Sequence, residues 1–419
     1  MRSIKTANKQ ANEITSPYDA KHLSRDEKVI RGAFYTPESI VNEVVKLVTP
    51  YIHRDNTVIA DMAGGCGAFM FPIVRMGIKN YVIADSDKKA VEFLLRHFDR
   101  NRVFCTNSLL NVDRKKFHVK ENDFLVVIGN PPYNDITSEY RKGKKGSFIC
   151  DDDLKDRDMG ISFLKAFNKL KANVICILHP LSYLIKETNF KRLKDFTKSY
   201  ILKEGITFPS SVFQHTGTAR FPVLIALYER NSEGMNFDYI KSFKFKILSS
   251  KKCFVLNEWT TTDGYVNKYP PRKGQPQTSP IGLYYYSFRD LNSVLRNASF
   301  LTEQKGNSVV VTIENFYKYA YLYCLKYFTS QIAENLWIFG NLSPLVDIQF
   351  VENNRKLFVL FALKTHKVFK IINSFTIEQL KCYYNVNDDE NLEEVETKLK
   401  NFFYDLYQVR CRENQGKTR

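Results

Sequence analysis

The chain has 419 residues, a length that suits two domains better than a single hydrophobic core. With 44% hydrophobic and 26% charged residues, its composition excludes a disordered or collagen-like chain. It contains no uncharged apolar stretch of about eighteen residues, and no apolar segment follows the first basic residues at the N-terminus. We therefore expect a cytoplasmic protein that neither spans a membrane nor is secreted.

The net charge is strongly positive, with 62 Lys and Arg against 45 Asp and Glu, or +17 at pH 7. Such an excess favours a polyanionic partner, most often a nucleic acid. A solvated basic surface without a partner would explain the charge equally well, so charge alone does not decide between the two.

The eight cysteines are widely scattered along the chain, and no two of them form a CxxC pair. We therefore interpret them as reduced thiols and predict neither a disulfide framework nor a zinc site.

The first half of the chain alternates apolar runs with amphipathic stretches. The runs are expected strands at 57–61, 81–85, 102–106, 124–130, 173–180 and 221–229. Near-continuous apolar runs of this length are typical of parallel strands that are covered on both faces. The segments 87–98 and 159–170 have helical spacing and would form crossover helices. This pattern predicts an α/β, doubly wound, mostly parallel sheet.

The second half differs in composition: it is rich in aromatic residues and Lys, and its apolar residues show no regular spacing. The Pro- and Gly-dense segment 269–280 cannot form a helix or a central strand, and the stretch after residue 386 has the spacing of a C-terminal helix. The expected division is an N-terminal extension at 1–30, an α/β domain at 31–235 and a mixed α+β domain at 236–419.

Distinctive residues stand where the first three expected strands end. In an open α/β sheet, ligands bind beyond the carboxyl ends of the strands. Asp61 ends the first strand and is followed by the glycine-rich loop 63–67, whose backbone N–H groups can approach a ligand closely. Asp85 ends the second strand, where a carboxylate can accept both hydroxyls of a ribose. Asn107 follows the third strand and could bond an adenine edge, although it is more often a turn former.

The fourth strand ends in the tetrapeptide Asn130-Pro131-Pro132-Tyr133. Two prolines remove two backbone donors and leave carbonyls as acceptors. The Asn130 side-chain oxygen and the Pro131 carbonyl can each accept a bond from an exocyclic amine, while Tyr133 stacks on the ring. The loop therefore suits a planar substrate that carries an amine.

This tetrapeptide resembles the NPPY motif of DNA adenine-N6 methyltransferases, and the segment 32–37, GAFYTP, resembles their additional cofactor motif. The order of the motifs, followed by a C-terminal domain, is similar to the gamma-order group from restriction-modification systems. The resemblance covers roughly residues 30–230. It implies a seven-stranded Rossmann-like methyltransferase sheet, methyl transfer from S-adenosylmethionine with S-adenosylhomocysteine as product, and a C-terminal target-recognition domain for double-stranded DNA.

The resemblance implies a role for each residue that stands at a position of the family's motifs. The catalytic set would be Asn130, Pro131 and Tyr133, with a second aromatic ring from the segment 208–230, for which Phe221 is the first candidate and Phe213 the runner-up. Asn130 would also touch the cofactor. The other implied cofactor contacts are Tyr35 and Thr36 for methionine, Asp61, Ala63 and Gly65 in the loop, Asp85 for ribose and Asn107 for adenine.

The chain departs from the family pattern at several positions. Met62, Gly64 and Cys66 replace the usual Pro, Cys and Ser of the loop, and Asn107 stands where the family often has Asp. Asp61, Ala63, Gly65 and Gly67 are retained, so cofactor binding is still expected. Asn107 keeps an acceptor oxygen but not its charge.

The implied chemistry requires neither a general base before transfer nor a metal ion, because a sulfonium is a strong electrophile. Residues 151–153 are three consecutive aspartates, which do not converge well on one ion. We interpret them as a solvated loop face opposite the basic residues 141–145.

DNA binding is expected to involve both domains. Residues 231–419 contain 25 basic and 19 acidic side chains, and the rest of the positive charge lies in the first 230 residues. Arg272, Lys273 and Gln275 are candidate DNA contacts, although their segment could equally be an exposed linker. A monomer is the default for an asymmetric target, and a separate cognate restriction endonuclease is a candidate partner.

Other readings stay open at this stage. NPPY also occurs in methyltransferases of the same fold that act on release-factor glutamine or on ribosomal RNA, although the FYTP segment and the long C-terminal extension argue against them. A dehydrogenase would give NPPY no role, and too few residues precede FYTP for a fused nuclease domain. A DNA-binding protein that has lost turnover is the non-enzyme alternative.

Overall fold

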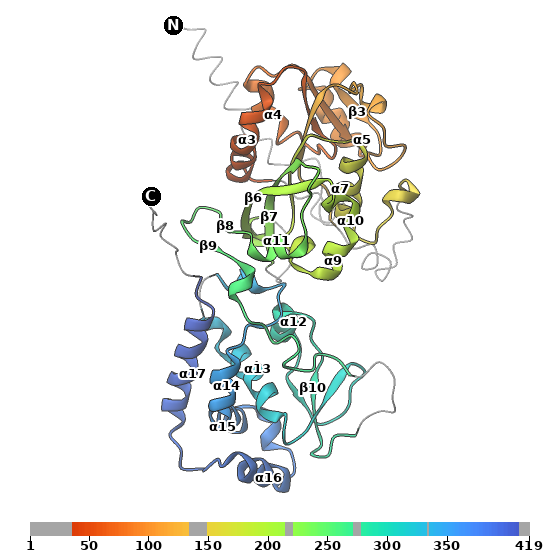
Figure 1. The fold of residues 1–419 in the computed structure, drawn as a ribbon. Coiled ribbons are helices and arrows are strands. Elements are labelled where there is room, and N and C mark those ends of the chain that lie inside the picture. Colours follow the sequence, from red (N-terminus) through yellow and green to blue (C-terminus); the bar gives the residue numbers. More distant parts are fainter. Residues whose placement is uncertain (1–35, 134–148, 214–220, 271–277, 333–334, 410–419) are drawn as a thin grey trace. The chain divides into compact units, whose positions relative to one another are not determined.

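The computed structural model describes residues 36–133, 149–213, 221–270, 278–332 and 335–409 (Figure 1). The chain divides into two compact units, of which the first comprises Met1–Thr218 and Val223–Ser250 and the second comprises Ala219–Pro222 and Lys251–Arg419. This division falls later than the predicted one at residue 235. The helix α11 (Phe237–Ser242) and the strand β8 (Phe245–Ile247), expected in the second domain, belong to the first unit. The reason is that β8 pairs in parallel with β6. The predicted extension 1–30 lies outside the described residues.

The strands of the first unit form one sheet in the order β3-β2-β1-β4-β5-β7-β6-β8. β1, β2, β3, β4 and β5 are mutually parallel where they pair, while β7 runs antiparallel to β5. The predicted mostly parallel α/β sheet is confirmed, and β8 extends it beyond the seven strands that were expected. The strand bounds are β1 Thr57–Asp61, β2 Tyr81–Asp85, β3 Val103–Cys105, β4 Phe124–Gly129, β5 Val174–Pro180, β6 Tyr200–Pro209 and β7 Pro222–Arg230.

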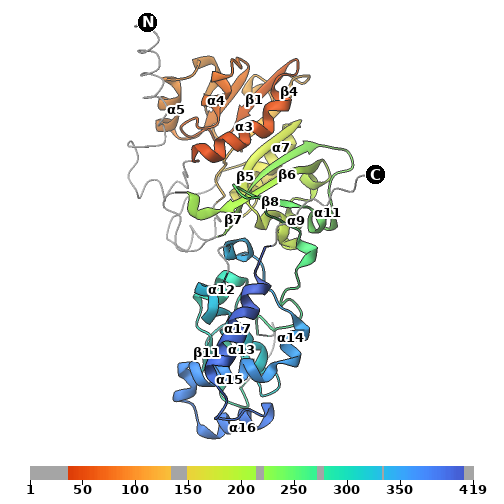
Figure 2. The same cartoon turned by 90° about the vertical axis from the view of Figure 1, so that its left-hand side faces the viewer.

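Helices cover the sheet of the first unit. The helix α3 packs on β1, β4 and β5 through an apolar stripe that includes Ile40, Val44 and Val48, spaced one helical turn apart (Figure 2). Asp87 caps the helix after β2 by accepting a bond from the Lys89 N–H. The bounds are α3 Glu38–Ile52, α4 Met70–Arg75, α5 Lys88–Leu95, α7 Met159–Lys169, α8 Ser182–Ile185, α9 Glu187–Arg192 and α10 Lys194–Thr197.

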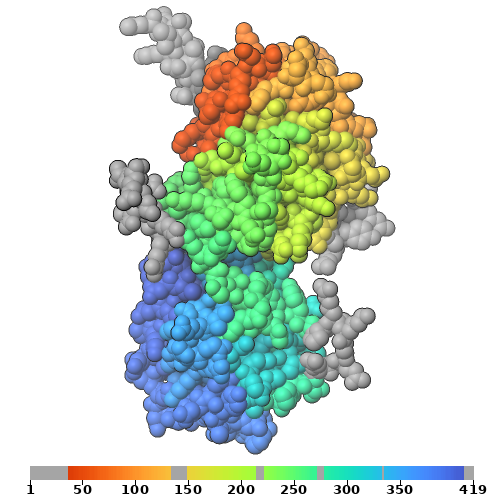
Figure 3. All heavy atoms as spheres, in the orientation of Figure 1, coloured from red at the N-terminus to blue at the C-terminus, as the bar shows by residue number. Residues whose placement is uncertain are grey.

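The second unit combines a small sheet with helices. β10 lies between β11 and β12, and both pairings are antiparallel. The predicted C-terminal helix is α17, whose Val395, Leu399 and Phe403 are buried and which packs on α13 and α15. In Figures 1 and 3, α17 (blue) forms one flank of this unit and β10 the other. The bounds are β9 Cys253–Phe254, β10 Leu283–Tyr286, β11 Phe300–Leu301, β12 Ser308–Val311, α12 Leu291–Arg296, α13 Phe316–Phe328, α14 Ile348–Asn353, α15 Arg355–Thr365, α16 Ser374–Tyr384 and α17 Leu392–Leu406.

Among the described residues, no helix combines the length and apolar character needed to cross a bilayer. The cysteines in this part of the chain are free thiols.

Candidate functional site

The sheet brings three predicted site residues to one edge. β1 lies between β2 and β4, and Asp61 is in register with Ile83 of β2 and Ile128 of β4. Asp85 and Asn130 each stand two residues beyond those partners. Because all three strands are parallel, their carboxyl ends and the loops that follow meet at the same edge.

Asp61 is buried at the centre of this edge, with 1% of its surface exposed. Its Oδ1 accepts a bond from the Ala63 N–H at 3.2 Å. A Cβ atom at Gly129 would lie 2.7 Å from the same oxygen, so the end of β4 must be glycine to approach this carboxylate. Burial raises the pKa of Asp61 to about 7, and the nearby negative charge of Asp85 adds to the rise.

The glycine-rich loop is tied to Asp85. The Gly65 N–H donates to Asp85 Oδ2 and the Asp87 N–H donates to Asp85 Oδ1, both at 2.8 Å. Burial raises the pKa of Asp85, although these backbone donors oppose the rise. Gly65 has a φ of +51° with no atom within 4 Å of the position that a Cβ would occupy, so the loop opens outward there. Gly67 has a φ of +76°, and a Cβ on it would lie 2.7 Å from the ring of Phe98.

Asn107 forms a turn at the end of β3. Its Oδ1 accepts from the Leu109 N–H at 2.9 Å, and its Nδ2 donates to the Ile149 carbonyl at 2.7 Å. The neighbouring Ser108 is buried, and its hydroxyl has no hydrogen-bond partner among the described residues. The sequence offered no signal for Ser108, since a serine after a strand is common in turns.

Asn130 is anchored by the segment that precedes α3. Its Nδ2 donates to the hydroxyl oxygen of Thr36 at 3.2 Å, and Thr36 is buried, with 3% of its surface exposed. This contact joins two motifs that are 94 residues apart in the sequence. Because the amide nitrogen faces Thr36, the amide oxygen of Asn130 faces away from it. Tyr35 lies outside the described residues.

The rest of the tetrapeptide is packed against α7. Pro131 is buried, whereas Pro132 and Tyr133 are half-buried. The hydroxyl of Tyr133 is inside the protein, and burial raises its pKa. A Cβ atom at Gly160 would lie 3.0 Å from Tyr133 Cβ, so the first turn of α7 closely approaches this residue.

The two candidate aromatic partners differ in exposure. Phe221, just before β7, is half-buried. Phe213 is buried and makes an edge contact with Phe208 at a centroid distance of 5.7 Å. The candidate DNA contacts Arg272, Lys273 and Gln275 lie outside the described residues.

The aspartate run 151–153 is held by protein groups. Lys169 pairs with Asp151 and Asp153, each at 3.0 Å. Asp151 also accepts from the N–H groups of Asn111 and Val112. In the part of the chain that the structure describes, no group of three or more His, Cys, Asp or Glu residues could hold a metal ion.

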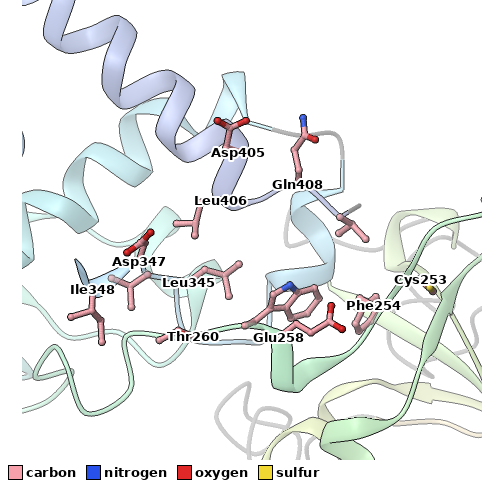
Figure 4. Close-up of a pocket in the computed structure, with 13 residues that line it drawn as sticks. Cys253, Phe254, Glu258, Thr260, Leu345, Asp347, Ile348, Asp405, Leu406 and Gln408 are labelled. Atoms are coloured by element: carbon pink, nitrogen blue, oxygen red, sulfur yellow. The ribbon is translucent and has the colours of Figure 1, made fainter. Parts of the chain in front are cut away.

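A separate hollow of about 800 Å³ lies in the second unit (Figure 4). Asp405, near the end of α17, and Gln408, just beyond it, line it together with Asp347 and Glu258. None of the predicted catalytic or cofactor residues lines this hollow, so it is distinct from the edge described above.

The fold and the loops at this edge define the class of protein. A mostly parallel sheet with a glycine-rich loop after β1, an acidic residue at the end of β2 and Asn-Pro-Pro-Tyr after β4 is the arrangement of an S-adenosylmethionine-dependent methyltransferase. Residues 79–213 match the model of the Eco57I restriction-modification methylase family. This segment, which spans less than half of the chain, includes Asp85 and the tetrapeptide, and the match confirms the resemblance seen in the sequence.

Individual relatives are distant. Ribosomal RNA small subunit methyltransferase A of Mycoplasmoides gallisepticum is 20% identical over 224 residues, which are 54% of this chain and 75% of the relative. A class I S-adenosylmethionine-dependent methyltransferase structure from Listeria monocytogenes has a TM-score of 0.37 at 18% identity, over 51% of this chain and 66% of that one. A modification subunit of a type I restriction enzyme from Vibrio vulnificus has a TM-score of 0.39 at 14% identity, over 60% of this chain and 52% of that one.

Proposed function

We propose that the protein is a site-specific DNA adenine-N6 methyltransferase that uses S-adenosylmethionine. The observation that carries the proposal is the bond between Asn130 and Thr36, which holds the amide of the Asn-Pro-Pro-Tyr loop beside the strand ends that bear Asp61 and Asp85. The match of residues 79–213 to the model of a restriction-modification methylase family supports DNA as the substrate.

The residues at the edge fit S-adenosylmethionine. Gly65 leaves open space beside the glycine-rich loop, and Asp85, which accepts from the Gly65 N–H, stands at the end of β2, where a ribose would be held. The buried hydroxyl of Ser108 has no partner among the described residues, which suits a polar ligand atom. Thr36 and Asp61 would lie near the methionine part. When bound, the cofactor supplies an electrophilic methyl group on a sulfonium.

The chain's own contribution is to orient the amine. Nitrogen N6 of adenine is a poor nucleophile because its lone pair is delocalised into the ring. The Asn130 Oδ1 and the Pro131 carbonyl would accept bonds from the two N6 hydrogens and hold them out of the ring plane, which localises the lone pair on nitrogen. The Thr36 bond fixes the Asn130 amide in the orientation that this task needs.

The target adenine must leave the duplex to reach this loop. Methyltransferases that act on bases extrude them, at a cost of a few kcal/mol. Stacking on Tyr133 would return roughly 1–3 kcal/mol, and the half-buried Phe221 is the candidate for the second face. The second unit is proposed to bind DNA and read its sequence, with Arg272, Lys273 and Gln275 as candidate contacts.

The decisive experiment is modification-sensitive sequencing of DNA from cells that express the chain. N6-methyladenine is expected at one sequence motif, and Asn130→Ala or Tyr133→Ala should abolish it while cofactor affinity changes by no more than a few-fold. Asn168→Ala is the matched control, because the Asn168 amide also donates a hydrogen bond, to the Asp195 carbonyl, but lies near the C-terminal end of α7, away from the loop. Unmarked genomic adenine, or full activity in either loop variant, would refute the proposal.

A second candidate function is methylation of RNA, which is favoured by the 20% identity to a ribosomal RNA methyltransferase. Nucleoside analysis of ribosomal RNA from the same cells separates the two. A methyl mark that appears in RNA but not in DNA would assign this alternative. Cofactor binding with no mark in either would point to a protein that has lost turnover.

A further inference from the structure

The first turn of α7 lies directly against the proposed target-base loop. β5 is the parallel neighbour of β4, with Ile177 in register with Gly129. His179, two residues further along β5, and the short helix α8 that follows are therefore near the same edge as the tetrapeptide. α7 begins at Met159 and brings Gly160 against Tyr133.

Three residues make a compact contact at this point. Asp158 caps α7 by accepting the Gly160 N–H at 3.1 Å. The same oxygen, Oδ1, accepts a bond from the hydroxyl of Tyr183, which is 1% exposed. A Cβ atom at Gly160 would lie 2.4 Å from the Tyr183 hydroxyl oxygen and 3.0 Å from Tyr133 Cβ. Any residue larger than glycine at position 160 would therefore displace one of the two tyrosines.

The ring of Tyr183 packs against a buried histidine of β5, His179. His179 stacks on it with a centroid distance of 5.2 Å and an interplanar angle of 10°. His179 Nδ1 must donate to the Pro180 carbonyl, which is only an acceptor, and the two are 2.9 Å apart. In neutral imidazole, Nε2 then accepts from the hydroxyl of Tyr228 at 2.7 Å. Burial lowers the pKa of His179 to about 4, so the ring is neutral at pH 7.

A half-buried salt bridge fixes the chain just before this cap. Asp156 pairs with Lys165 of α7 at 3.3 Å and with Arg192 of α9. It also accepts from the Asp158 N–H at 3.0 Å. The start of α7 is therefore tied to α8 through Asp158 and Tyr183 and to α9 through Asp156, so the surface against which Tyr133 packs has little freedom to move.

From these contacts we propose that Tyr183 and Asp158 are positioning residues for the target base. They hold Gly160 against the Cβ atom of Tyr133, and so set the plane in which the Tyr133 ring meets the extruded base. This inference rests on the proposed methyl transfer to a flipped base. Neither residue touches the reacting atoms, so the effect is on the geometry of the bound base and leaves cofactor binding unchanged.

The test compares Tyr183→Phe with the wild-type full-length chain. The substitution keeps the stack on His179 and removes the hydroxyl that donates to Asp158. With a duplex that carries the methylated motif, kcat is expected to fall roughly ten- to a hundredfold, while KM for DNA and the dissociation constant of S-adenosylmethionine stay within about twofold. A duplex with 2-aminopurine at the target position should show an altered fluorescence on binding, because stacking of the flipped base is changed.

Tyr200→Phe is the matched control. Tyr200 is completely buried in the same unit, and its hydroxyl donates to the Ala172 carbonyl at 2.7 Å, just before β5 and so at the opposite edge of the sheet. It should lose comparable stability but keep its kcat and its 2-aminopurine signal. If Tyr183→Phe behaves like Tyr200→Phe, the positioning role is wrong and Tyr183 is simply part of the core.

Two further variants test the positioning role if Tyr183→Phe fails to fold. Asp158→Asn retains the cap of α7 but weakens the acceptor for Tyr183, so it should lower kcat in the same direction. Gly160→Ala should lower kcat by displacing Tyr133, and unchanged kcat in both variants would overturn the inference. If the wild-type chain itself transfers no methyl group to DNA, the proposed function is wrong. This outcome differs from a failure of the positioning role, in which the wild type is active and the variants keep its kcat.

Discussion

The buried carboxyl of Asp61 should make the first unit less stable as pH rises. Its pKa in the folded chain is about 7, against an ordinary value of 3.8. Below about pH 4 both the folded and unfolded states are protonated, and the group contributes no difference. Between pH 4 and 7 only the unfolded state ionises, so stability falls with increasing pH. Each pH unit is worth about 1.4 kcal/mol, so above pH 7 the total loss is about 4 kcal/mol.

Asp61→Asn should remove this dependence. Asparagine cannot ionise and its oxygen can still accept from the Ala63 N–H, so the variant is expected to be more stable than the wild type by up to about 4 kcal/mol at pH 8 and about equal to it near pH 4. Urea unfolding followed by circular dichroism, with hydrogen exchange of peptides that cover β1 and β4, measures both pH profiles. The exposed Asp55 provides the control variant Asp55→Asn. Parallel profiles for wild type and Asp61→Asn between pH 5 and 7.5 would refute the reasoning.

Three further outcomes follow from the same edge. Thr36→Val removes an acceptor for the Asn130 amide. Loss of one hydrogen bond costs about 0.5–1.5 kcal/mol, so kcat for methyl transfer should drop roughly two- to tenfold in a steady-state assay. Gly67→Ala adds a clash with the ring that crowds it as well as strain at positive φ, and should lower the melting temperature more than Gly77→Ala, which has a φ of +85° and open space around it. Asp85→Ala should weaken S-adenosylmethionine binding at least tenfold, about 1.4 kcal/mol, by calorimetry.

The central strands could be predicted because their sequences are continuous apolar runs with polar ends. β1, β2 and β4 begin and end within one residue of the expected positions. β6 was missed because Lys203, Glu204 and Gly205 interrupt its pattern. Its stability comes from its neighbours, including an ion pair between Glu204 and Lys246 of β8 at 2.7 Å. Such pairings join distant parts of the chain, and local patterns do not record them.

The position of the candidate site could also be predicted from local patterns, because the residue types at the strand ends indicate that a ligand binds at this edge of the sheet. What the sequence could not indicate is which atoms are already bonded within the protein. Asn107 was a candidate for an adenine, yet both polar atoms of its amide are bonded to backbone groups, one of them 42 residues away. The burial of Ser108 next to it depends on packing between elements and has no local signature.

The predicted ligand residues also hold one another in place, and this affects how substitutions at the edge should be interpreted. Asp85 holds the glycine-rich loop through Gly65, and Gly129 closes on Asp61. Removing a side chain here therefore has two effects: it removes a contact to the ligand, and it also removes a bond that holds a neighbouring loop. A conservative change that keeps the internal bond, such as Asp85→Asn beside Asp85→Ala, separates the two effects. If the cofactor contact dominates, both variants lose affinity alike, because the charge is absent from each; if the loop anchor dominates, Asp85→Asn retains most of the affinity, because its amide oxygen can still accept from the Gly65 N–H.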